Sequence, residues 1–312
     1  MPPRRPSLRA SYLRWLNRRE YRLAELGHTL EVRSDRIEER LADLEGLLKK
    51  VQTSVARAAP RWGPGAEPVA LDYSRAAIYL APTTKLARNR SRACAKEPFT
   101  VEWIERSLQR GDVLYDIGAN VGAYALIAGR QANGGVRVYA FEPAYATYAT
   151  LCDNVVLNQA DEIVRPLQVF LAPRTEVTTM NLRDRRAGAA QHEDHDEQPG
   201  DTAYGAAQYR QPVLAYRLDD LIRDGLPTPN HVKLDVDGAE LSVLQGAPQA
   251  LSNPALRSLM IEVAERNAKG IAELLGAHGL VENARHERPD DPAGRAGFWY
   301  AEFVRGAGIS GR

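Results

Sequence analysis

The residues with the clearest chemical potential form a turn between a predicted strand and a predicted helix. Residues 116–122 read Asp-Ile-Gly-Ala-Asn-Val-Gly and follow the apolar run Val113–Ile117. Glycines allow a backbone to approach a ligand closely, and the helix expected over 123–129 offers free N–H groups at its N-terminus. Twenty residues beyond Gly122, a second apolar run ends in Glu-Pro at 142–143, where an acidic side chain can accept both hydroxyls of a ribose. Together these features predict a nucleotide-like ligand.

The first position of this turn distinguishes between classes of nucleotide. A dinucleotide-binding fold expects G-x-G-x-x-G, which seats a pyrophosphate on the helix, but here Asp116 stands in place of the first glycine. A carboxylate repels pyrophosphate and stabilises an ammonium group. The pattern therefore favours S-adenosylmethionine, which carries an ammonium group and a ribose but no phosphate. A P-loop is excluded because no G-x-x-x-x-G-K-[ST] occurs. The alternative is a tight turn in which an Asp or Asn side chain only caps the helix.

Strands and helices alternate on both sides of this turn. Apolar runs typical of strands occupy residues 113–117, 136–141, 164–171, 231–236 and 259–263, and helical stretches are expected at 123–129, 145–157 and 241–251. This alternation predicts an α/β fold in which a doubly wound, mostly parallel sheet is covered by helices on both faces. Ligands of such sheets bind at the carboxyl ends of the strands, which is where the turn and Glu142 lie.

Six motifs follow one another in order between residues 96 and 265. They read Lys-Glu-Pro-Phe at 96–99, Gly-Asp-Val-Leu-Tyr-Asp-Ile-Gly-Ala-Asn-Val-Gly-Ala-Tyr at 111–124, Phe-Glu-Pro at 141–143, Leu-Asp-Asp-Leu at 218–221, Lys-Leu-Asp-Val-Asp-Gly-Ala-Glu-Leu-Ser-Val-Leu-Gln-Gly-Ala at 233–247 and Ile-Glu-Val at 261–263. Their order and spacing resemble the FkbM family of methyltransferases. The resemblance implies a class I Rossmann-like methyltransferase that uses S-adenosylmethionine, commonly on hydroxyls of sugars or secondary metabolites.

The resemblance also implies which residues bind the cofactor. The acidic, glycine and asparagine positions of the 116–122 turn would face the methionine part, and Glu142 would hold the ribose. Asn154 and Asn158 match family positions too, although an Asn near a helix C-terminus is ordinary. The candidate cofactor-binding residues are Asp116, Gly118, Ala119, Asn120, Gly122, Glu142, Pro143 and Asn154.

The turn after the strand at 231–236 bears on the reaction. Its sequence, Asp-Val-Asp-Gly at 235–238, differs from the Asp/Asn-Pro-Pro-aromatic turn of enzymes that methylate the amino group of adenine. Neither Cys94 nor Cys152 has the context of the nucleophile in enzymes that methylate pyrimidine carbons. An alcohol is therefore the expected acceptor. Because it loses a proton as it attacks the methyl carbon, a general base or a metal is useful.

Four residues are the candidates for this catalytic role: Asp235, Lys233, Asp237 and Glu240. Asp235 is the first choice for a base or substrate-orienting group, and Lys233 is either a base with a depressed pKa or its partner. Lys233, Asp235 and Asp237 alternate in strand spacing and can share one side. Glu240 either joins them or caps the next helix. Glu262, at the end of the next strand, would line the same cleft.

A break in the pattern at residues 183–212 predicts an exposed, mobile insertion in the catalytic domain. It contains His-Glu-Asp-His-Asp-Glu at 192–197, in which adjacent carboxylates are more typical of a solvated loop than of a metal site. No metal ligand is therefore predicted. A substrate lid is the remaining alternative for this segment.

The first 59 residues have a different pattern from the rest of the chain. Leu16, Leu23, Leu30, Ile37, Leu44 and Val51 recur at a seven-residue step, as the d positions of a coiled coil do. Gly27 and Ser34 interrupt the a positions. We expect an α-helical coiled-coil segment at 1–59 that binds a second copy or a partner, a linker at 60–65 and a methyltransferase domain at 66–312. One amphipathic helix packed on its own domain is the alternative.

Composition narrows the classes of function. Lys and Arg number 41 against 40 Asp and Glu, and this near-neutral balance argues against a nucleic-acid partner. Two cysteines make no disulfide framework, and no apolar run is long enough to span a membrane, so a cytoplasmic location is expected. The sequence predicts a methyltransferase for a small-molecule or glycan hydroxyl. The alternatives are an RNA methyltransferase and a non-catalytic coiled-coil scaffold with a relict cofactor pocket.

Overall fold

The computed structural model describes residues 37–38, 40–46, 49, 67–182, 184–188, 193–194, 209–287 and 297–306. The chain divides into two units, 1–53 and 54–312. In the first unit, residues 37–38, 40–46 and 49 are helical. Ile37, Leu41 and Leu44, which occupy a and d positions of the heptad pattern, are 59%, 52% and 63% exposed. The helix agrees with the pattern, and its self-association stays a prediction. The linker expected at 60–65 lies outside the described residues.

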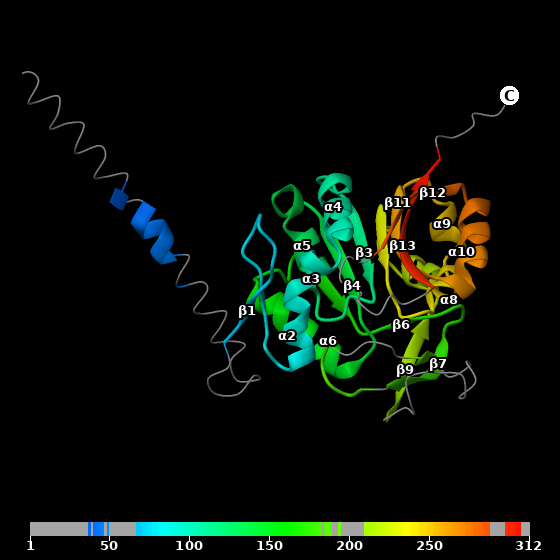
Figure 1. Ribbon diagram of the computed structural model, residues 1–312, viewed down its shortest axis with the longest axis horizontal. Coiled ribbons are helices and arrows are strands. Elements are labelled where there is room, and N and C mark those ends of the chain that lie inside the picture. The colour runs from blue at the N-terminus through cyan, green and yellow to red at the C-terminus, as the bar shows by residue number, and fades with distance from the viewer. Residues whose placement is uncertain are drawn as a thin grey trace, which may run out of the picture. The chain divides into compact units, whose positions relative to one another are not determined.

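The second unit is built on a seven-stranded sheet with the order β12-β13-β11-β10-β3-β4-β5 (Figure 1). Parallel pairs join β11 to β10, β10 to β3, β3 to β4 and β4 to β5. β13 runs antiparallel to both of its neighbours. This is the mostly parallel sheet that the sequence predicts. The strands are β3 (Val113–Ile117), β4 (Arg137–Phe141), β5 (Val164–Leu167), β10 (His231–Leu234), β11 (Ser258–Ala264), β12 (Leu280–His286) and β13 (Phe298–Arg305).

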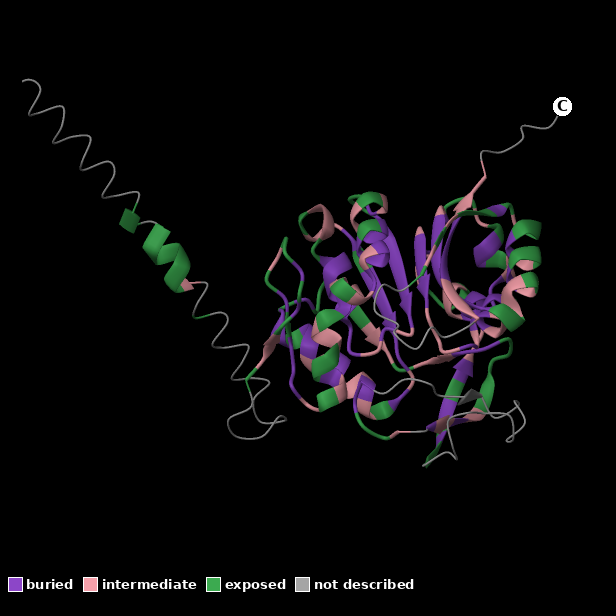
Figure 2. Cartoon of the chain, in the orientation of Figure 1, coloured by how far each residue is buried: buried purple, intermediate pink, exposed green. Residues whose placement is uncertain are grey.

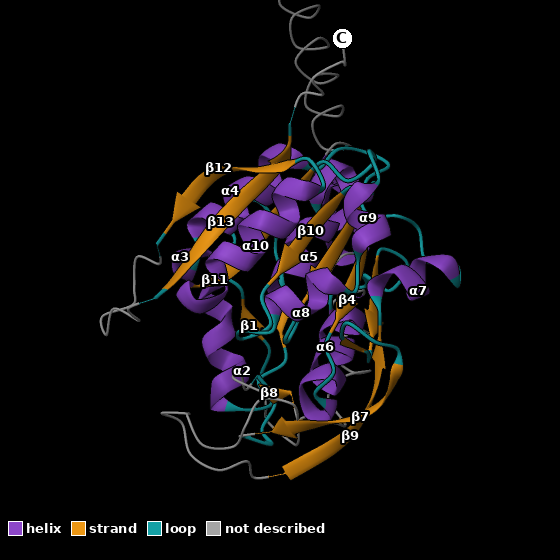
Figure 3. Cartoon of the chain, turned by 90° about the vertical axis from the view of Figure 1, so that its right-hand side faces the viewer, coloured by secondary structure: helices purple, strands orange, loops and turns teal. Residues whose placement is uncertain are grey.

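Helices cover both faces of the sheet because both faces of its strands are apolar (Figure 3). Along β3, Leu114 belongs to one buried cluster, and Val113 and Tyr115 belong to another on the opposite face. The central strands are accordingly buried, while the outer surfaces of the helices are exposed (Figure 2). The helices are α4 (Pro98–Ser107), α5 (Ala123–Gly129) and α6 (Tyr145–Leu157) on the first face, and α7 (Leu218–Arg223), α8 (Glu240–Gln245), α9 (Pro248–Ser252) and α10 (Glu265–Ala277) on the second.

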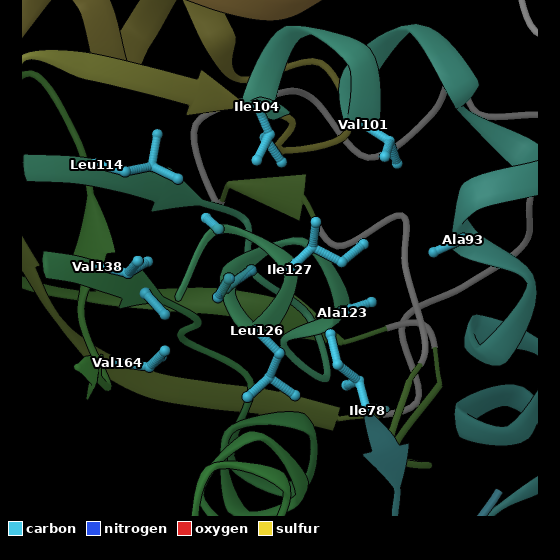
Figure 4. Close-up of a cluster of buried hydrophobic side chains, with 14 of the residues drawn as sticks. Ile78, Ala93, Val101, Ile104, Leu114, Ala123, Leu126, Ile127, Val138 and Val164 are labelled. Atoms are coloured by element: carbon cyan, nitrogen blue, oxygen red, sulfur yellow. The ribbon is translucent and has the colours of Figure 1, made fainter. Parts of the chain in front are cut away.

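The first cluster packs β3, β4 and β5 against the helices that follow and precede them (Figure 4). Leu114, Val138 and Val164, one from each strand, lie beside Leu126 and Ile127 of α5. All five side chains are at most 1% exposed, so each contributes roughly 1.5–3 kcal/mol by leaving water. Their burial holds α5, and hence the turn that precedes it, firmly at the ends of the strands.

Two predicted elements are each divided in the structure. The run 164–171 forms β5 and a separate strand, β6 (Phe170–Leu171), in another sheet. Pro166 is tolerated because β5 is an edge strand of the main sheet. The helix expected at 241–251 divides into α8, which ends at its C-cap Gly246, and α9, which begins at Pro248.

The prediction of an exposed, mobile insertion at 183–212 is also partly wrong. Residues 209–212 belong to β9 (Tyr209–Tyr216), which pairs antiparallel with β7 (Glu176–Leu182). This four-stranded sheet also contains β8 (Glu193–Asp194), antiparallel to β7, and β6, parallel to β9. Buried and exposed side chains alternate along β9, but only over a few residues. Because the strand also contains Pro212, the sequence pattern did not indicate a strand there. Residues 184–188 are anchored as well, since the Thr84 hydroxyl donates to the Ala187 carbonyl at 2.6 Å. His192 and His195 lie outside the described residues.

The remaining elements are short. They are β1 (Val69–Ala70), β2 (Tyr79–Leu80), α2 (Lys85–Asn89), η1 (Arg90–Arg92), α3 (Ala93–Lys96) and the short turn η2 (Gln131–Gly134). Of these, η2 contacts α5, and β2 contacts α6. Thr84 caps α2 by accepting from the Ala87 N–H at 3.0 Å. Within the described ranges, every helix is too short or too polar to cross a lipid bilayer.

Candidate functional site

The predicted site residues meet at the carboxyl ends of β3, β4, β10 and β11. Lys233 and Asp116 are register partners on adjacent parallel strands. Glu142 follows β4, and Glu262 lies near the end of β11. This edge is where open α/β sheets bind ligands, so the topology itself gathers the candidate residues.

The turn after β3 has a conformation that demands its glycines. Gly118, Asn120 and Gly122 have positive φ angles of 80°, 51° and 88°. A Cβ on Gly118 would lie 1.8 Å from the carbonyl oxygen of Asp235, so the backbone of this turn touches the end of β10. The N–H groups of Gly118 and Ala119 donate to the Phe141 carbonyl at 3.0 and 2.9 Å. The turn is thus fixed against both neighbouring strands.

Glu142 is bound into the same turn. Its carboxylate accepts hydrogen bonds from the Asn120 N–H at 3.0 Å and the Ala144 N–H at 2.9 Å. Burial raises the pKa of Glu142 to about 7, although these two donors act in the opposite direction. Gln211 of β9 supports the loop by donating to the Pro143 carbonyl at 2.8 Å. A residue from the expected insertion therefore holds the Glu-Pro pair in place.

Asp116 is the most unusual group in the site. The side chain is completely buried, and neither carboxylate oxygen has a hydrogen-bond partner among the residues that the structure describes. Burial raises the pKa of Asp116 to about 6, and the Lys233 ammonium, 3.8 Å from Oδ1, partly offsets that rise. A buried carboxylate without donors costs free energy, so this one has unmet capacity for a cationic or hydrogen-bonding ligand.

Lys233 is the positive centre of the site. Its Nζ lies 3.3 Å from Asp235 Oδ2 and 5.0 Å from the centre of the Tyr124 ring. Burial works to lower the pKa of Lys233, but the carboxylates of Asp235 and Asp116 outweigh it and hold the pKa above its usual value. Of the two roles expected for Lys233, this arrangement favours a charged partner over a base with a depressed pKa.

Asp235 is the carboxylate that this lysine keeps ionised. Burial raises its pKa, but the cations of Lys233, Lys96 and Arg90 lower it, and the net pKa lies below the usual range. The side chain is 22% exposed, unlike the fully buried Asp116. Asp235 is therefore a charged acceptor of hydrogen bonds that is accessible from the carboxyl edge of the sheet.

Glu240 and Asp237 belong to the turn between β10 and α8. One oxygen of Glu240 accepts from the N–H groups of Val236 at 3.1 Å and Gly238 at 3.0 Å, which is the helix-capping alternative. Burial raises the pKa of Glu240 to about 7. Asp237 has a positive φ of 57°. The structure brings both residues beside Asp235, and Glu240 clearly shapes the turn; a catalytic role for either stays a prediction.

Asn154 connects the turn at 116–122 to the segment that follows β2. Its amide nitrogen donates to the Val121 carbonyl at 2.7 Å, and its oxygen accepts from the Ala81 N–H at 2.6 Å. Asn158 makes equivalent bonds to both backbone groups of Tyr79. These side chains tie β2 to α6 and to the turn after β3. Their backbone bonds account for the Asn residues structurally, and direct cofactor contact by Asn154 stays a prediction.

Three residues that the sequence analysis did not select complete the site. Glu97 and Tyr300 are buried beside Glu262, and Tyr124 lies under the Lys233 ammonium. Glu97 belongs to the Lys-Glu-Pro-Phe motif at 96–99, so this motif was the available signal. Tyr300 lies 38 residues beyond Glu262 on β13, and no local pattern links the two.

Comparison with known proteins identifies the family of the chain. The model of the methyltransferase FkbM domain matches residues 116–281, more than half of the chain. The hexuronic acid methyltransferase AglP of Haloferax volcanii is 29% identical over 186 residues, which cover 59% of this chain and 70% of that protein. The 31-O-demethyl-FK506 methyltransferase FkbM of Streptomyces tacrolimicus is 30% identical over 207 residues, which cover 58% of this chain and 76% of that protein.

Solved structures of methyltransferases also align with this chain, at low sequence identity. A methyltransferase FkbM from Methylobacillus flagellatus KT aligns with a TM-score of 0.44 and 17% identity, over 84% of this chain and 60% of that one. The TYW2 protein of M. jannaschii in complex with AdoMet aligns with a TM-score of 0.42 and 13% identity, over 78% of this chain and 89% of that one. The family model extends from the end of β3 to the start of β12 and includes the turn at 118–122, Glu142 and Asp235. Because this match covers more than half of the chain, the chain belongs to the FkbM methyltransferase family.

Proposed function

We propose that this protein transfers the methyl group of S-adenosylmethionine to a hydroxyl oxygen of a sugar, a glycan or a secondary metabolite. The names of the two relatives support this class of acceptor, since one acts on a hexuronic acid and the other on 31-O-demethyl-FK506. The observation that carries the proposal is the buried carboxylate of Asp116, which has no hydrogen-bond partner among the described residues and lies one strand away from Glu142.

The residues present fit this cofactor. Asp116 offers a buried negative charge to the ammonium group of the methionine part, and Glu142 offers a carboxyl to the ribose hydroxyls. The turn at 118–122 allows close approach of backbone because a side chain at Gly118 is sterically forbidden. When bound, S-adenosylmethionine supplies an electrophilic methyl group on a sulfonium sulfur.

The chain's own residues then have two tasks at the acceptor. Asp235 accepts a hydrogen bond from the acceptor hydroxyl, which orients the oxygen and takes up its proton as the new bond forms. Lys233 keeps Asp235 ionised from 3.3 Å away, so that it is available as an acceptor at neutral pH. The half-buried ring of Tyr124, whose centre is 5.0 Å from the ammonium nitrogen, also stabilises this charge.

Calorimetry with S-adenosylmethionine tests the cofactor half of the proposal. The loss of a charged hydrogen bond costs about 1.5–3 kcal/mol, so Asp116→Asn should weaken binding by roughly 10- to 100-fold. Asp161→Asn, at an exposed position after α6, is the matched control and should bind like the wild type. Folded wild-type protein that does not bind, or Asp116→Asn and Glu142→Gln variants that bind normally, would overturn it.

Transfer of a radiolabelled methyl group tests the acceptor half. Neutral sugars, uronic acids and polyhydroxylated macrolides are the acceptors to compare. We expect label in an alkali-stable ether on one of these, and at least 100-fold slower transfer by Asp235→Asn. Label on nitrogen or carbon would contradict the assignment of a hydroxyl acceptor, and label in RNA would contradict a sugar, glycan or secondary-metabolite acceptor.

A further inference from the structure

The turn at 235–238, which follows β10, has a backbone conformation that needs support. Asp237 and Gly238 have successive positive φ angles of 57° and 107°. A left-handed conformation is unfavourable for a residue with a Cβ, and such residues persist where neighbouring groups hold the backbone in place. Glycine accepts this conformation at position 238, whereas Asp237 needs contacts from outside the turn to keep it.

Two side chains from neighbouring helices hold this turn through Gly238. Oε1 of Glu240, the first residue of α8, accepts from the N–H groups of Val236 at 3.1 Å and Gly238 at 3.0 Å. The side-chain nitrogen of Asn267, in the first turn of α10, donates to the Gly238 carbonyl at 2.9 Å. Directly after the left-handed Asp237, the N–H of Gly238 is thus bonded to α8 and its carbonyl to α10.

The helix α10 is anchored so that its first turn lies against residues 235–238. Ile271 and Leu275 bury the helix in the core, where each side chain is at most 1% exposed. Next to Asn267, Arg266 packs on the same glycine, because a Cβ on Gly238 would lie 2.5 Å from Nη2 of the guanidinium. Asn is a weaker helix former than Ala, Glu or Lys. The bond to the Gly238 carbonyl, rather than helix propensity, therefore accounts for an Asn at this position.

The sheet holds the other end of the turn. The Asp235 N–H donates to the Ile117 carbonyl of β3 at 3.0 Å, and the Asp235 carbonyl lies against Gly118. The backbone of Asp235 is therefore fixed without α10, whereas the conformation of Asp237 depends on the bonds made from α8 and α10. Loss of the bond from α10 would release Asp237 and leave Asp235 and the turn at 118–122 in place.

Asp237 has a central position at the carboxyl edge of the sheet. It follows β10, which lies between β11, the strand that carries Glu262, and β4, the strand that precedes Glu142. Burial is the main cause of the raised pKa values of Glu142 and Glu262, and the charge of Asp237 raises both further. The carboxylate of Asp237 therefore acts on both sides of the proposed methyl-transfer site.

We infer that Asn267 is a positioning residue for methyl transfer, which acts by holding Asp237 in the left-handed conformation that places its carboxylate at the acceptor. This inference rests on the proposed function. Under that function the acceptor hydroxyl meets Asp235, and Asp237 is the second carboxylate of the same turn. A fixed Asp237 gives the acceptor one orientation, whereas a released Asp237 allows several, and the rate of transfer depends on orientation.

Steady-state methyl transfer to the fastest of the acceptors compared above tests whether Asn267 acts through Asp237. Asn267→Leu keeps the branched shape of the side chain and removes the donor. We expect kcat to fall roughly 10-fold or more, with the KM for S-adenosylmethionine unchanged. In the Asp237→Asn background the same change should lower kcat by less than about 2-fold, because the group that Asn267 positions is already lost. No loss of kcat in the wild-type background, or an equal loss in both backgrounds, would overturn the inference.

Asn230→Leu is the matched control at the opposite end of β10. The Asn230 side chain accepts from the Val113 N–H at 2.9 Å and donates to the Ala255 carbonyl at 3.1 Å, so its loss also removes bonds to backbone. This variant should leave kcat unchanged. Asn267→Gln, which retains the donor, should recover most of the activity. Asn267→Ser, whose hydroxyl is too short to reach the Gly238 carbonyl, replaces Asn267→Leu if the latter does not fold.

Carbon-13 NMR titration of Glu142 in the ligand-free protein tests the positioning without catalysis. The Glu142 pKa, about 7 in the wild type, should fall in Asp237→Asn, which removes the charge, and in Asn267→Leu, which lets the charge move away. It should not change in Asn230→Leu. An unchanged pKa in either of the first two variants would overturn the inference. If the pKa falls as expected but the wild type transfers no methyl group, the proposed function fails and the hold of Asn267 on Asp237 stands.

Discussion

The ammonium nitrogen of Lys233 lies 3.3 Å from a carboxylate oxygen of Asp235, and both side chains come from the same end of β10. Lys233 is also 3.8 Å from Asp116, so one cation compensates two carboxylates in a site with little access to water. A buried charge that loses its partner is far more costly than an exposed one. The stability and the chemistry of this edge of the sheet therefore depend on the same residue.

Replacement of the lysine should destabilise the fold in a pH-dependent way. Lys233→Met leaves Asp116 and Asp235 uncompensated, and we expect the free energy of unfolding to fall by about 3–5 kcal/mol at pH 7.5. The loss should be smaller at pH 5, where Asp116, with a pKa of about 6 in the wild type, is protonated. Urea denaturation at both pH values measures this. Lys269→Met, on the exposed surface of α10, is the control and should change stability by less than about 0.5 kcal/mol; equal losses at both pH values would contradict the explanation.

A methyl group at Gly118 should separate the two strands that form the site. Gly118→Ala adds both the strain of a left-handed conformation and a collision with the Asp235 carbonyl. Gly111→Ala is the matched control, because Gly111 also has a positive φ, 93°, but a Cβ there meets no atom within 4 Å. The control should lose only about 1–2 kcal/mol. Gly118→Ala should lose clearly more and should not bind S-adenosylmethionine in calorimetry. Similar behaviour of the two variants would show that the close approach is unimportant.

Glu142 should make stability depend on pH, in a direction set by its raised pKa. Its pKa in the folded protein is about 7, against 4.5 for an ordinary Glu, so the neutral form is favoured by folding. The stability that this provides is complete below pH 4.5 and is lost as the pH rises through about 7. Relative to wild type, Glu142→Gln should therefore gain stability by on the order of 3 kcal/mol between pH 4.5 and 8. Denaturation curves across this range measure the difference, and a flat one would contradict the burial of this carboxyl in solution.

The exposed apolar side chains of the first unit predict that its helix associates with a second copy of the chain. Leu44 is 63% exposed at a d position of the heptads, and a lysine there should disrupt a helical dimer. Light scattering should show an oligomer for the wild type and a monomer for Leu44→Lys. Asp43→Lys adds a lysine at the neighbouring c position, outside the apolar seam, and should stay oligomeric. A monomeric wild type would exclude self-association through this helix.

The strands and helices nearest the cofactor turn were predictable because their signals are local. Val113–Ile117 and Ala123–Gly129 have the bounds expected from the sequence, since an apolar run ends at a glycine turn and a helix begins directly after it. Glu142 and Asp235 could likewise be selected from their positions at strand ends. In these cases the parallel topology brings together residues whose local roles are already apparent.

Residues that act through distant partners could not be predicted in this way. Tyr300 contacts Glu97 across 203 residues, and only the antiparallel insertion of β13 beside β11 places it there. The charge state of Lys233 similarly depends on two carboxylates whose distances the sequence does not encode locally. Burial and register, which are properties of the whole sheet, determine both features.

The close approach of Gly118 to the carbonyl of Asp235 couples the positions of two turns that are far apart in the chain, because nothing larger than glycine fits between them. Under the proposed function, a change in the position of either turn would therefore alter the cofactor-binding backbone and the Asp235 carboxylate together. For protein engineering, the turn after β3 and the turn after β10 are therefore one unit, and a substitution in either must be compatible with the other.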